Sequence, residues 1–362
     1  MGVGVSAHRL AGTVAGEGGV GTLSSVDLRR HHPDLMQATG RSRDKAAIDA
    51  ANLVALDREI RAARELAGGR GLIAVNVMRA VSDYPAYVRQ SCISGADAIV
   101  VGAGLPFDLP EITADFPDVA LIPILSEARG VNLVLKKWMR KGRLPDAIVI
   151  EHPRYAGGHL GASRVEDLGD ARFDFAQVIP AVLALFDELG IEHGRIPIIA
   201  AGGINSPARL REALALGAAA AQVGTAFAVT EECDAHPEFK RVLAGAKPED
   251  IVTFMSVAGL PARAVRTPWL ATYLERLETL QRRAKPRREC TLAFDCLLQC
   301  GLRDGIARIG QFCIDFRLAA ALRGDVKHGL FFRGSEPVPF GAAIRPVRDL
   351  IGYLLGPEQV VT

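Results

Sequence analysis

The sequence predicts an α/β fold of the TIM-barrel, (β/α)8, type. Seven short runs rich in β-branched residues recur between residues 19 and 227, and stretches with helical spacing separate most of them. The runs are almost continuously apolar, as parallel strands covered on both faces are. Glycine-rich turns follow nearly every run, and in a barrel the turns at these carboxyl ends form the active site. An open, doubly wound sheet is the alternative.

The expected elements follow one another in a regular order. A closed barrel needs eight strands, so the first strand is expected to be missing or truncated, its place being before residue 1. Ser6 is expected to cap a helix that runs to about Ala15. The expected strands are 19–25, 72–78, 98–102, 119–125, 147–151, 196–201 and 219–227, and the expected helices between them are 43–66, 84–92, 132–139, 173–189 and 207–216.

The strand–helix rhythm ends after residue 229. The part from 230 to 330 shows helical patterns at 237–243, 268–285, 294–301 and 314–322 and no convincing strand. A last amphipathic helix is expected at 347–355, before Gly356 and Pro357. We therefore predict a β/α barrel at 1–229, a mostly helical excursion with a Cys-rich segment at 230–335, and a C-terminal helix within 336–362 that returns to the barrel.

Composition excludes several classes of partner. The 43 Lys and Arg residues nearly balance the 41 Asp and Glu residues, so no general attraction to nucleic acid or anionic membranes is expected. The basic run at 281–288 surrounds a proline and lacks interleaved aromatic residues, which favours a solvated linker. The longest apolar stretch, 213–229, contains Gln222 and Thr225 and is too polar for a membrane span. Because Arg9 interrupts the first residues, no secretory signal is expected, and a cytoplasmic location follows.

Two glycine-containing turns predict a phosphate site. The run 196–201 ends in Gly202 and Gly203, and one strand–helix unit later Gln222 is followed by Val, Gly224 and Thr225. In α/β barrels the loops after the last two strands bind phosphate through backbone N–H groups, and a glycine lets the oxygens approach those donors. Two ordinary strand-to-helix turns are the alternative interpretation.

A histidine framed by glycines follows the strand at 147–151. Gly157 and Gly158 precede His159, so the imidazole is expected to have little local packing and to face a cavity, where it could exchange a proton near neutral pH. A solvent-exposed loop histidine is equally compatible with the local sequence. Glu151, at the strand end, could contact a ligand or cap the turn.

Asn76 is the polar residue of an otherwise apolar strand. Its amide must find hydrogen-bond partners, either on a bound heteroaromatic ring or on a neighbouring strand.

Four of the six cysteines lie close together in the sequence: Cys290, Cys296, Cys300 and Cys313. Four thiols could bind zinc or an iron–sulfur cluster. The spacing matches no common metal motif, however, and Cys296 and Cys300 are one helical turn apart, which favours buried reduced thiols and no metal.

Taken together, the motifs resemble the nitronate monooxygenase family, formerly called 2-nitropropane dioxygenase, which includes FMN-dependent enoyl-acyl-carrier-protein reductases. The resemblance covers about residues 1–230. It rests on MGVGVS at 1–6, Asn76 after Val75, GAD at 95–97 with GAGLP at 102–106, AGGHLG at 156–161, AGG at 201–203 and QVGT at 222–225.

The resemblance implies a TIM-barrel flavoprotein with FMN at the carboxyl ends of the strands. By position, the FMN phosphate would be held by Gly202, Gly203, Gly224 and Thr225, the rest of the cofactor would meet Gly2, Asn76, Glu151, Gly157, Gly158 and Gln222, and His159 would be the catalytic histidine. Some relatives carry a lysine at the end of strand five, whereas this chain has no basic residue from 122 until Arg129.

The function implied is oxidative denitrification of alkyl nitronates with O2, with His159 as the base for neutral nitroalkanes. One alternative is a flavin reductase that uses NAD(P)H as co-substrate and acts on enoyl thioesters or quinones. A non-catalytic flavin-binding or electron-transfer module is the other. The expected partner is a small-molecule substrate, and a homodimer is compatible with the sequence.

Overall fold

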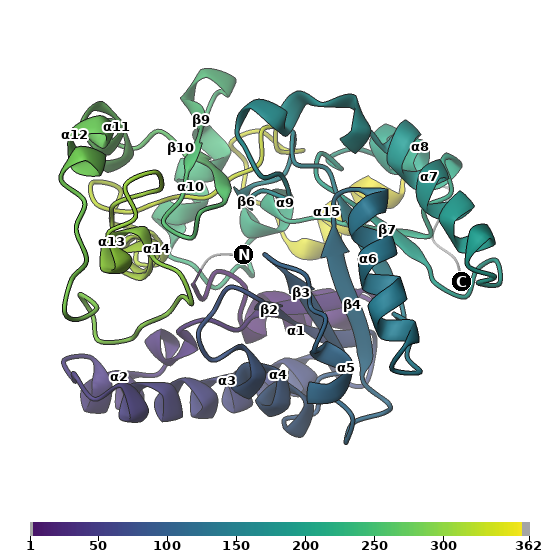
Figure 1. The fold of residues 1–362 in the computed structure, drawn as a ribbon, viewed down its shortest axis with the longest axis horizontal. Helices are drawn as coiled ribbons and strands as arrows, with labels where there is room; N and C mark the ends of the chain where they lie inside the picture. Colours follow the sequence, from purple (N-terminus) through teal and green to yellow (C-terminus); the bar gives the residue numbers. More distant parts are fainter. Residues whose placement is uncertain (1–2, 357–362) are drawn as a thin grey trace.

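The computed structural model describes residues 3–356 (Figure 1). The strands are β1 (Val20–Ser24), β2 (Leu72–Met78), β3 (Ala98–Gly102), β4 (Ala120–Leu125), β5 (Ile148–Glu151), β6 (Gly158–His159), β7 (Ile198–Ala201), β8 (Ala220–Gln222), β9 (Ile251–Met255) and β10 (Pro261–Val265). The α-helices are α1 (His8–Gly16), α2 (Pro33–Thr39), α3 (Lys45–Ala67), α4 (Tyr84–Ile93), α5 (Leu109–Ile112), α6 (Ala128–Met139), α7 (Phe175–Glu188), α8 (Pro207–Ala215), α9 (Thr225–Ala228), α10 (Pro237–Gly245), α11 (Pro268–Glu275), α12 (Leu277–Arg282), α13 (Gly301–Asp304), α14 (Ile314–Leu322) and α15 (Val347–Leu355).

The main sheet confirms the predicted fold class. Its order is β1-β2-β3-β4-β5-β7-β8, so the strands follow the sequence around the sheet and each of the seven expected runs contains one. The run expected at 219–227 is a strand only at Ala220–Gln222, because helix α9 begins at Thr225. All six pairings are parallel, as between Val20 and Leu72 and between Ser24 and Asn76. The edge strands are β1 and β8, and no strand within residues 3–356 joins them. Parallel pairing brings the carboxyl ends of all seven strands to one face.

Helices cover the sheet and bury its outer face (Figure 1). Helix α3 packs against α1 through an alanine-rich face, in which Ile60 and Ala63 are fully buried. Gly12 of α1 permits this approach, because a Cβ atom there would lie 2.8 Å from the Cβ of Leu66. Helix α15 packs against α1 and α8, so the last described helix returns to the barrel. The boundaries at 229 and 335 remain a prediction.

The excursion after residue 229 is less helical than predicted. Helices α10, α11, α12 and α14 lie where helical patterns were expected, but β9 and β10 form an antiparallel hairpin in a part for which no strand was predicted. In β10 all five residues are buried, including Arg263, so neither the alternation of a surface strand nor a purely apolar run marks it. The hairpin pairs with β6, and the two elements lie side by side in Figure 1.

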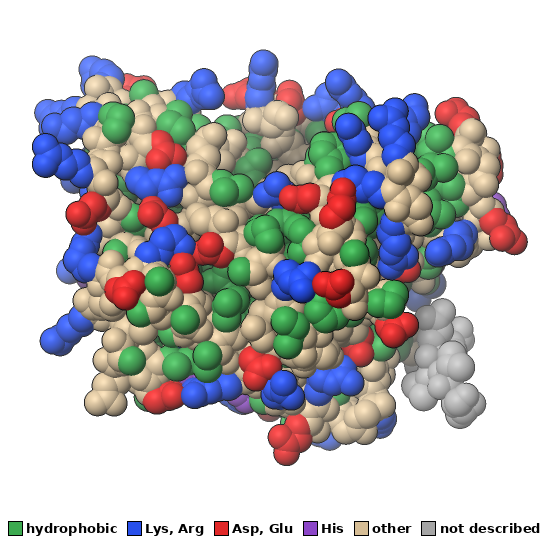
Figure 2. Space-filling view, turned by 60° about the horizontal axis from the view of Figure 1, so that its bottom comes forward, with side chains coloured by type: hydrophobic (Ala, Val, Ile, Leu, Met, Phe, Trp, Pro, Cys, Tyr) green, Lys and Arg blue, Asp and Glu red, His purple; other side chains and the backbone are tan. Residues whose placement is uncertain are grey.

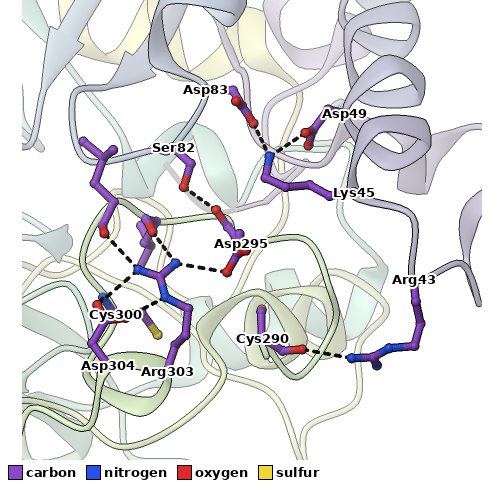
Figure 3. Close-up of polar contacts among 12 residues, drawn as sticks. Arg43, Lys45, Asp49, Ser82, Asp83, Cys290, Asp295, Cys300, Arg303 and Asp304 are labelled. Carbon is purple, nitrogen blue, oxygen red and sulfur yellow. Dashed lines mark hydrogen bonds and ion pairs between the residues drawn. The ribbon is translucent and has the colours of Figure 1, made fainter. Parts of the chain in front are cut away.

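The helix expected at 294–301 is absent, and this segment is an irregular loop ahead of α13. Asp295 has a left-handed backbone with φ of 46°, which a helix interior does not allow. Arg303 holds the loop by donating hydrogen bonds to the carbonyl oxygens of Leu297 and Leu298 and to the Asp295 carboxylate (Figure 3). Tertiary hydrogen bonds to one arginine therefore replace the intrahelical ones.

The outer surface of the molecule carries charges of both signs. Figure 2 shows Lys and Arg side chains interspersed with Asp and Glu, in keeping with the formal charge of +2. Among residues 3–356, no helix has the length and apolar character needed to cross a bilayer. This surface offers no large field of one sign on the face shown.

The prediction that Ser6 caps helix α1 is wrong, because a residue from the excursion caps this helix. The Ser6 hydroxyl donates to the carbonyl oxygen of Thr22, whereas the Asp234 carboxylate accepts hydrogen bonds from the backbone N–H groups of Ala7, Arg9 and Leu10. A carboxylate at a helix N-terminus satisfies free donors and interacts favourably with the helix dipole. Asp234 thereby ties the start of the excursion to the first helix of the barrel.

Replacing Asp234 with Ala should lower the free energy of unfolding by about 2 kcal/mol, because three backbone donors lose their acceptor. Urea denaturation followed by circular dichroism measures this. Asp44→Ala is the control, since Asp44 caps α3 at an exposed position and accepts from only two N–H groups. A loss no larger than that of Asp44→Ala would contradict the role assigned to Asp234.

Candidate active site

A cavity of about 1080 Å³ lies at the carboxyl ends of the strands, and it brings together the residues singled out from the sequence. It extends beside the open edges of the sheet, past Val20 of β1 and Ala220 of β8, to Leu354 of α15. Gly2 lies outside the described residues. The other predicted site residues all line the cavity: Asn76, Glu151, Gly157, Gly158, His159, Gly202, Gly203, Gln222, Gly224 and Thr225.

The glycine pair after β7 is required by the backbone. Gly202 and Gly203 both have positive φ, of 90° and 81°. A Cβ atom on Gly202 would lie 2.7 Å from the carbonyl oxygen of His152, and one on Gly203 would lie 3.0 Å from Tyr155. Packing and left-handed backbone alone therefore demand glycine at both positions.

Gly224 has a different reason to be glycine. Its φ is −107°, which any residue can adopt, and a Cβ atom there would meet no described atom within 4 Å. Only the cavity lies where a side chain would go. The missing side chain thus leaves room for a ligand beside the backbone at the start of α9.

Thr225 lies next to this open space and is held by the excursion. Its hydroxyl oxygen accepts a hydrogen bond of 3.0 Å from the backbone N–H of Gly334. The hydroxyl hydrogen remains available to donate to a ligand oxygen. Gly334, which lines the cavity 109 residues further along the chain, was not predicted from the sequence.

His159 is better anchored than its glycine neighbours suggested. As part of β6 it pairs with Ala262 of β10, and the next residue, Leu160, donates its N–H to the carbonyl oxygen of Pro261 at 2.8 Å. Its ring lies against that of Phe332, with 5.6 Å between the ring centres. The expectation of little local packing was therefore wrong for the backbone.

The imidazole of His159 nevertheless faces the cavity without a partner. Its Nε2 atom is buried and has no hydrogen-bond partner among the described residues. Burial lowers the pKa of His159 to about 4, so the ring is neutral at pH 7. A neutral imidazole with an unused nitrogen can accept a proton from a bound molecule.

Three further polar side chains line the cavity floor. Glu151 ends β5, and burial raises the pKa of its carboxyl to about 7. Asn76 on β2 and Gln222 on β8 make no side-chain hydrogen bond to another described residue. For Asn76 the structure therefore offers no backbone partner on a neighbouring strand, and both amides are free to bind a ligand.

His152, seven residues before His159, is structural. It is buried, its Nε2 atom contacts the Asp174 carboxylate at 3.1 Å, and its Nδ1 atom accepts the N–H of Arg154. The ring thereby supports the turn that leads from β5 toward β6.

The cysteine segment shows no metal geometry. Among the described residues, no three His, Cys, Asp or Glu side chains are placed to hold a metal ion. Burial raises the pKa of Cys313 to about 12 and also that of Cys296, so both thiols are protonated. In Figure 3 the carbonyl oxygen of Cys290 accepts a hydrogen bond from Arg43, and the backbone N–H of Cys300 donates to Asp304, so both cysteines make these contacts through backbone atoms.

The fold and the cavity define an α/β-barrel protein with a large cavity at the carboxyl ends of its strands. Comparison with known families makes this specific: the nitronate monooxygenase family model matches residues 1–355. The chain belongs to the nitronate monooxygenase family.

Relatives and solved structures agree with this membership. The chain is 32% identical over 120 residues to the nitronate monooxygenase of Pseudomonas aeruginosa, covering 33% of this chain and 31% of that protein. It is 35% identical over 126 residues to that of Paraburkholderia phytofirmans, covering 35% and 32%. The matched part thus spans about a third of the curated relatives' length.

Two solved structures share the fold. FabK from Thermotoga maritima has a TM-score of 0.66 at 21% identity and covers 97% of this chain and 88% of its own. A nitroalkane oxidase from Streptomyces ansochromogenes has a TM-score of 0.64 at 22% identity and covers 98% and 92%. At these identities the likeness supports the barrel fold alone.

Replacing His159 with Gln should make the protein less sensitive to acid. Because the folded pKa is depressed, the unfolded chain takes up a proton as the pH falls from 6.5 toward 4 while the folded chain does not, so stability is lost in that window. Between pH 7 and pH 4.5 the His159→Gln variant should therefore lose roughly 2 kcal/mol less unfolding free energy than the wild type.

Unfolding free energies of the wild type and of His159→Gln, each measured at pH 7 and pH 4.5, give this difference. Glu151 is present in both proteins, so its own titration cancels. His193→Gln, at an exposed position, is the control and should behave like the wild type. Identical pH dependence of His159→Gln and wild type would refute a buried neutral imidazole.

Proposed function

We propose that the protein is an FMN-dependent oxidoreductase that catalyses the oxidative denitrification of alkyl nitronates with O2. The observation that carries the proposal is a cavity in which a glycine-lined pocket and an unpartnered neutral imidazole lie at the same face of the barrel. Family membership supports the reaction class.

The residues present fit FMN. The space beside Gly224, the hydroxyl of Thr225 and the turn at Gly203 would hold the phosphate, since backbone N–H groups at such turns bind phosphate oxygens. The free amides of Asn76 and Gln222 would bind the polar edge of the ring system. No basic residue lies between Ile122 and Arg129, so these contacts would be made without a cation at the end of β4.

Bound FMN would supply the electron transfer between the nitronate and oxygen. Burial depresses the pKa of His159 and keeps the ring neutral at neutral pH. In the tautomer that carries the ring hydrogen on Nδ1, the free Nε2 would remove the α-proton of a neutral nitroalkane. Leu260, Leu330 and Phe332 line the same cavity and would exclude water from that proton transfer.

The alternative within enzymes is reduction of enoyl thioesters or quinones with NAD(P)H. Oxygen uptake that requires nitronate supports the monooxygenase, whereas NAD(P)H consumption without nitronate supports the reductase. Neither activity, in protein that binds flavin, would support a binding or electron-transfer module.

Under this proposal the protein is a cytoplasmic enzyme whose substrate is a small molecule, and a homodimer is compatible with it. Size-exclusion chromatography with light scattering tests the oligomeric state.

Replacing Gly224 with Val should release FMN without unfolding the protein. A Cβ atom there meets no described atom within 4 Å, and the valine methyl groups beyond it would fill the space assigned to the phosphate. Flavin absorbance per protein after gel filtration should fall at least tenfold, with an unchanged circular dichroism spectrum. Gly245→Val is the matched control, because its side chain also points into open space but away from the cavity. If Gly224→Val keeps its flavin, the phosphate lies elsewhere.

Replacing His159 with Ala should lower kcat for a neutral nitroalkane by about 10²-fold or more, because the proton acceptor is lost. Turnover of the preformed nitronate should change far less, since its proton is already removed. Oxygen-electrode assays of both substrates, with His193→Ala as control, test this. Equal loss on the two substrates would argue against a role in proton removal.

A further inference from the structure

Arg263 is a buried cation that no part of the proposed chemistry uses. It lies on β10 and is 5% exposed, and within the described chain no carboxylate is close enough to form an ion pair with it. Burial lowers its pKa to about 10, so it remains charged at neutral pH. Burying a charge without an ion-pair partner is costly and needs compensation by hydrogen bonds.

The hydrogen bonds of Arg263 go to the loop that leads to His159. Its Nη1 atom donates to the carbonyl oxygen of Pro153 at 3.1 Å and to that of Ala156. Both acceptors belong to the turn between β5 and β6. The side chain itself does not line the cavity.

The backbone of β10 holds the other end of the same loop. Ala262 is opposite His159 in the register, and Pro261 accepts the N–H of Leu160. Three consecutive residues of β10 therefore contact the segment before, at and after His159. Both ends of the turn and the histidine are therefore held by one strand.

The loop needs such a support because of its composition. Gly157 and Gly158 directly precede His159, Gly158 has φ of 75°, and glycines lose more backbone freedom on ordering than other residues. On its other side the loop abuts the excursion backbone, since a Cβ atom on Gly157 would lie 2.4 Å from the carbonyl carbon of Arg333. Ser335 of the excursion donates its N–H to the carbonyl oxygen of Tyr155 at 3.1 Å and its hydroxyl to that of Arg154 at 3.3 Å, but it does not reach the carbonyls of Pro153 and Ala156.

We propose that Arg263 is a positioning residue for His159: its guanidinium fixes the Pro153 and Ala156 carbonyls at the two ends of the turn, so that the imidazole is held in the cavity with its Nε2 atom free. The effect of Arg263 on catalysis rests on the proposed function, whereas its effect on the placement of the imidazole does not. A residue that acts in this way differs from one that only stabilises the fold, because its loss changes the surroundings of His159 in protein that is still folded.

The test compares Arg263→Met, Arg263→Gln and Arg263→Lys with wild type. Methionine keeps the length of the side chain but no donor, glutamine keeps a neutral donor, and lysine keeps the charge. Arg29→Met is the control for the loss of a buried guanidinium: Arg29 is equally buried, donates to the Asp27 carboxylate as well as to the carbonyl oxygen of Thr39, and does not line the cavity.

The first measurement is the NMR titration of His159 in protein labelled with ¹³C-histidine. The His159 signal is identified as the one missing from the spectrum of His159→Gln. In wild type and Arg29→Met the ring should stay neutral down to about pH 5. In Arg263→Met its pKa should rise by at least one unit toward 6.5, with partial recovery in the Gln and Lys variants. This readout needs neither flavin nor turnover.

The second measurement separates positioning from binding. Flavin content of Arg263→Met should match wild type, while kcat for a neutral nitroalkane should fall at least tenfold and the value for preformed nitronate much less. An unchanged His159 titration in folded Arg263→Met, or in Arg263→Gln if the Met variant does not fold, overturns the proposal. Absence of flavin and turnover in wild type would instead refute the proposed function and leave the titration result standing.

Discussion

The site depends on a two-residue strand pairing. The barrel by itself orients the turns after β7 and β8, but the segment that carries His159 leaves the barrel after β5 and is held by hydrogen bonds to β10. The two halves of the cavity therefore come from different sheets. Two further residues of the excursion contact the barrel: Asp234 caps α1, and the N–H of Gly334 donates to Thr225. The excursion is a structural part of the site and more than a cover over it.

Burial sets the protonation states within the cavity. The same low-dielectric surroundings that keep His159 neutral also favour the neutral form of Glu151, so at pH 7 the imidazole and a large part of the Glu151 carboxyl are uncharged. The two groups affect stability in opposite directions as the pH falls below 7, since one resists protonation and the other accepts it more readily than in the unfolded chain. Arg263 is the exception: burial lowers its pKa only to about 10, so it keeps its charge at pH 7, and backbone carbonyls accept its hydrogen bonds.

Much of the fold was predictable because its signals are local. Parallel strands that are covered on both faces must be apolar throughout, and this shows directly in runs such as 72–78 and 98–102. The glycines at 202 and 203 mark a turn whose backbone excludes side chains, and a polar Asn76 in an apolar strand needs a partner. These residues line one cavity because parallel strands end at one face.

What the sequence determined by itself was the barrel, the face that holds the site and most of the residues around it, since each follows from local burial or backbone geometry. Only the tertiary structure decided the pairing of β6 with β10, the capping of α1 by Asp234 and the contact of Arg263 with the His159 loop. These interactions join residues more than 100 positions apart, and a hydrogen bond to a distant carbonyl leaves no periodicity in either segment. For that reason the excursion's strands and its buried arginine had no signal in the sequence, although they hold the histidine in place.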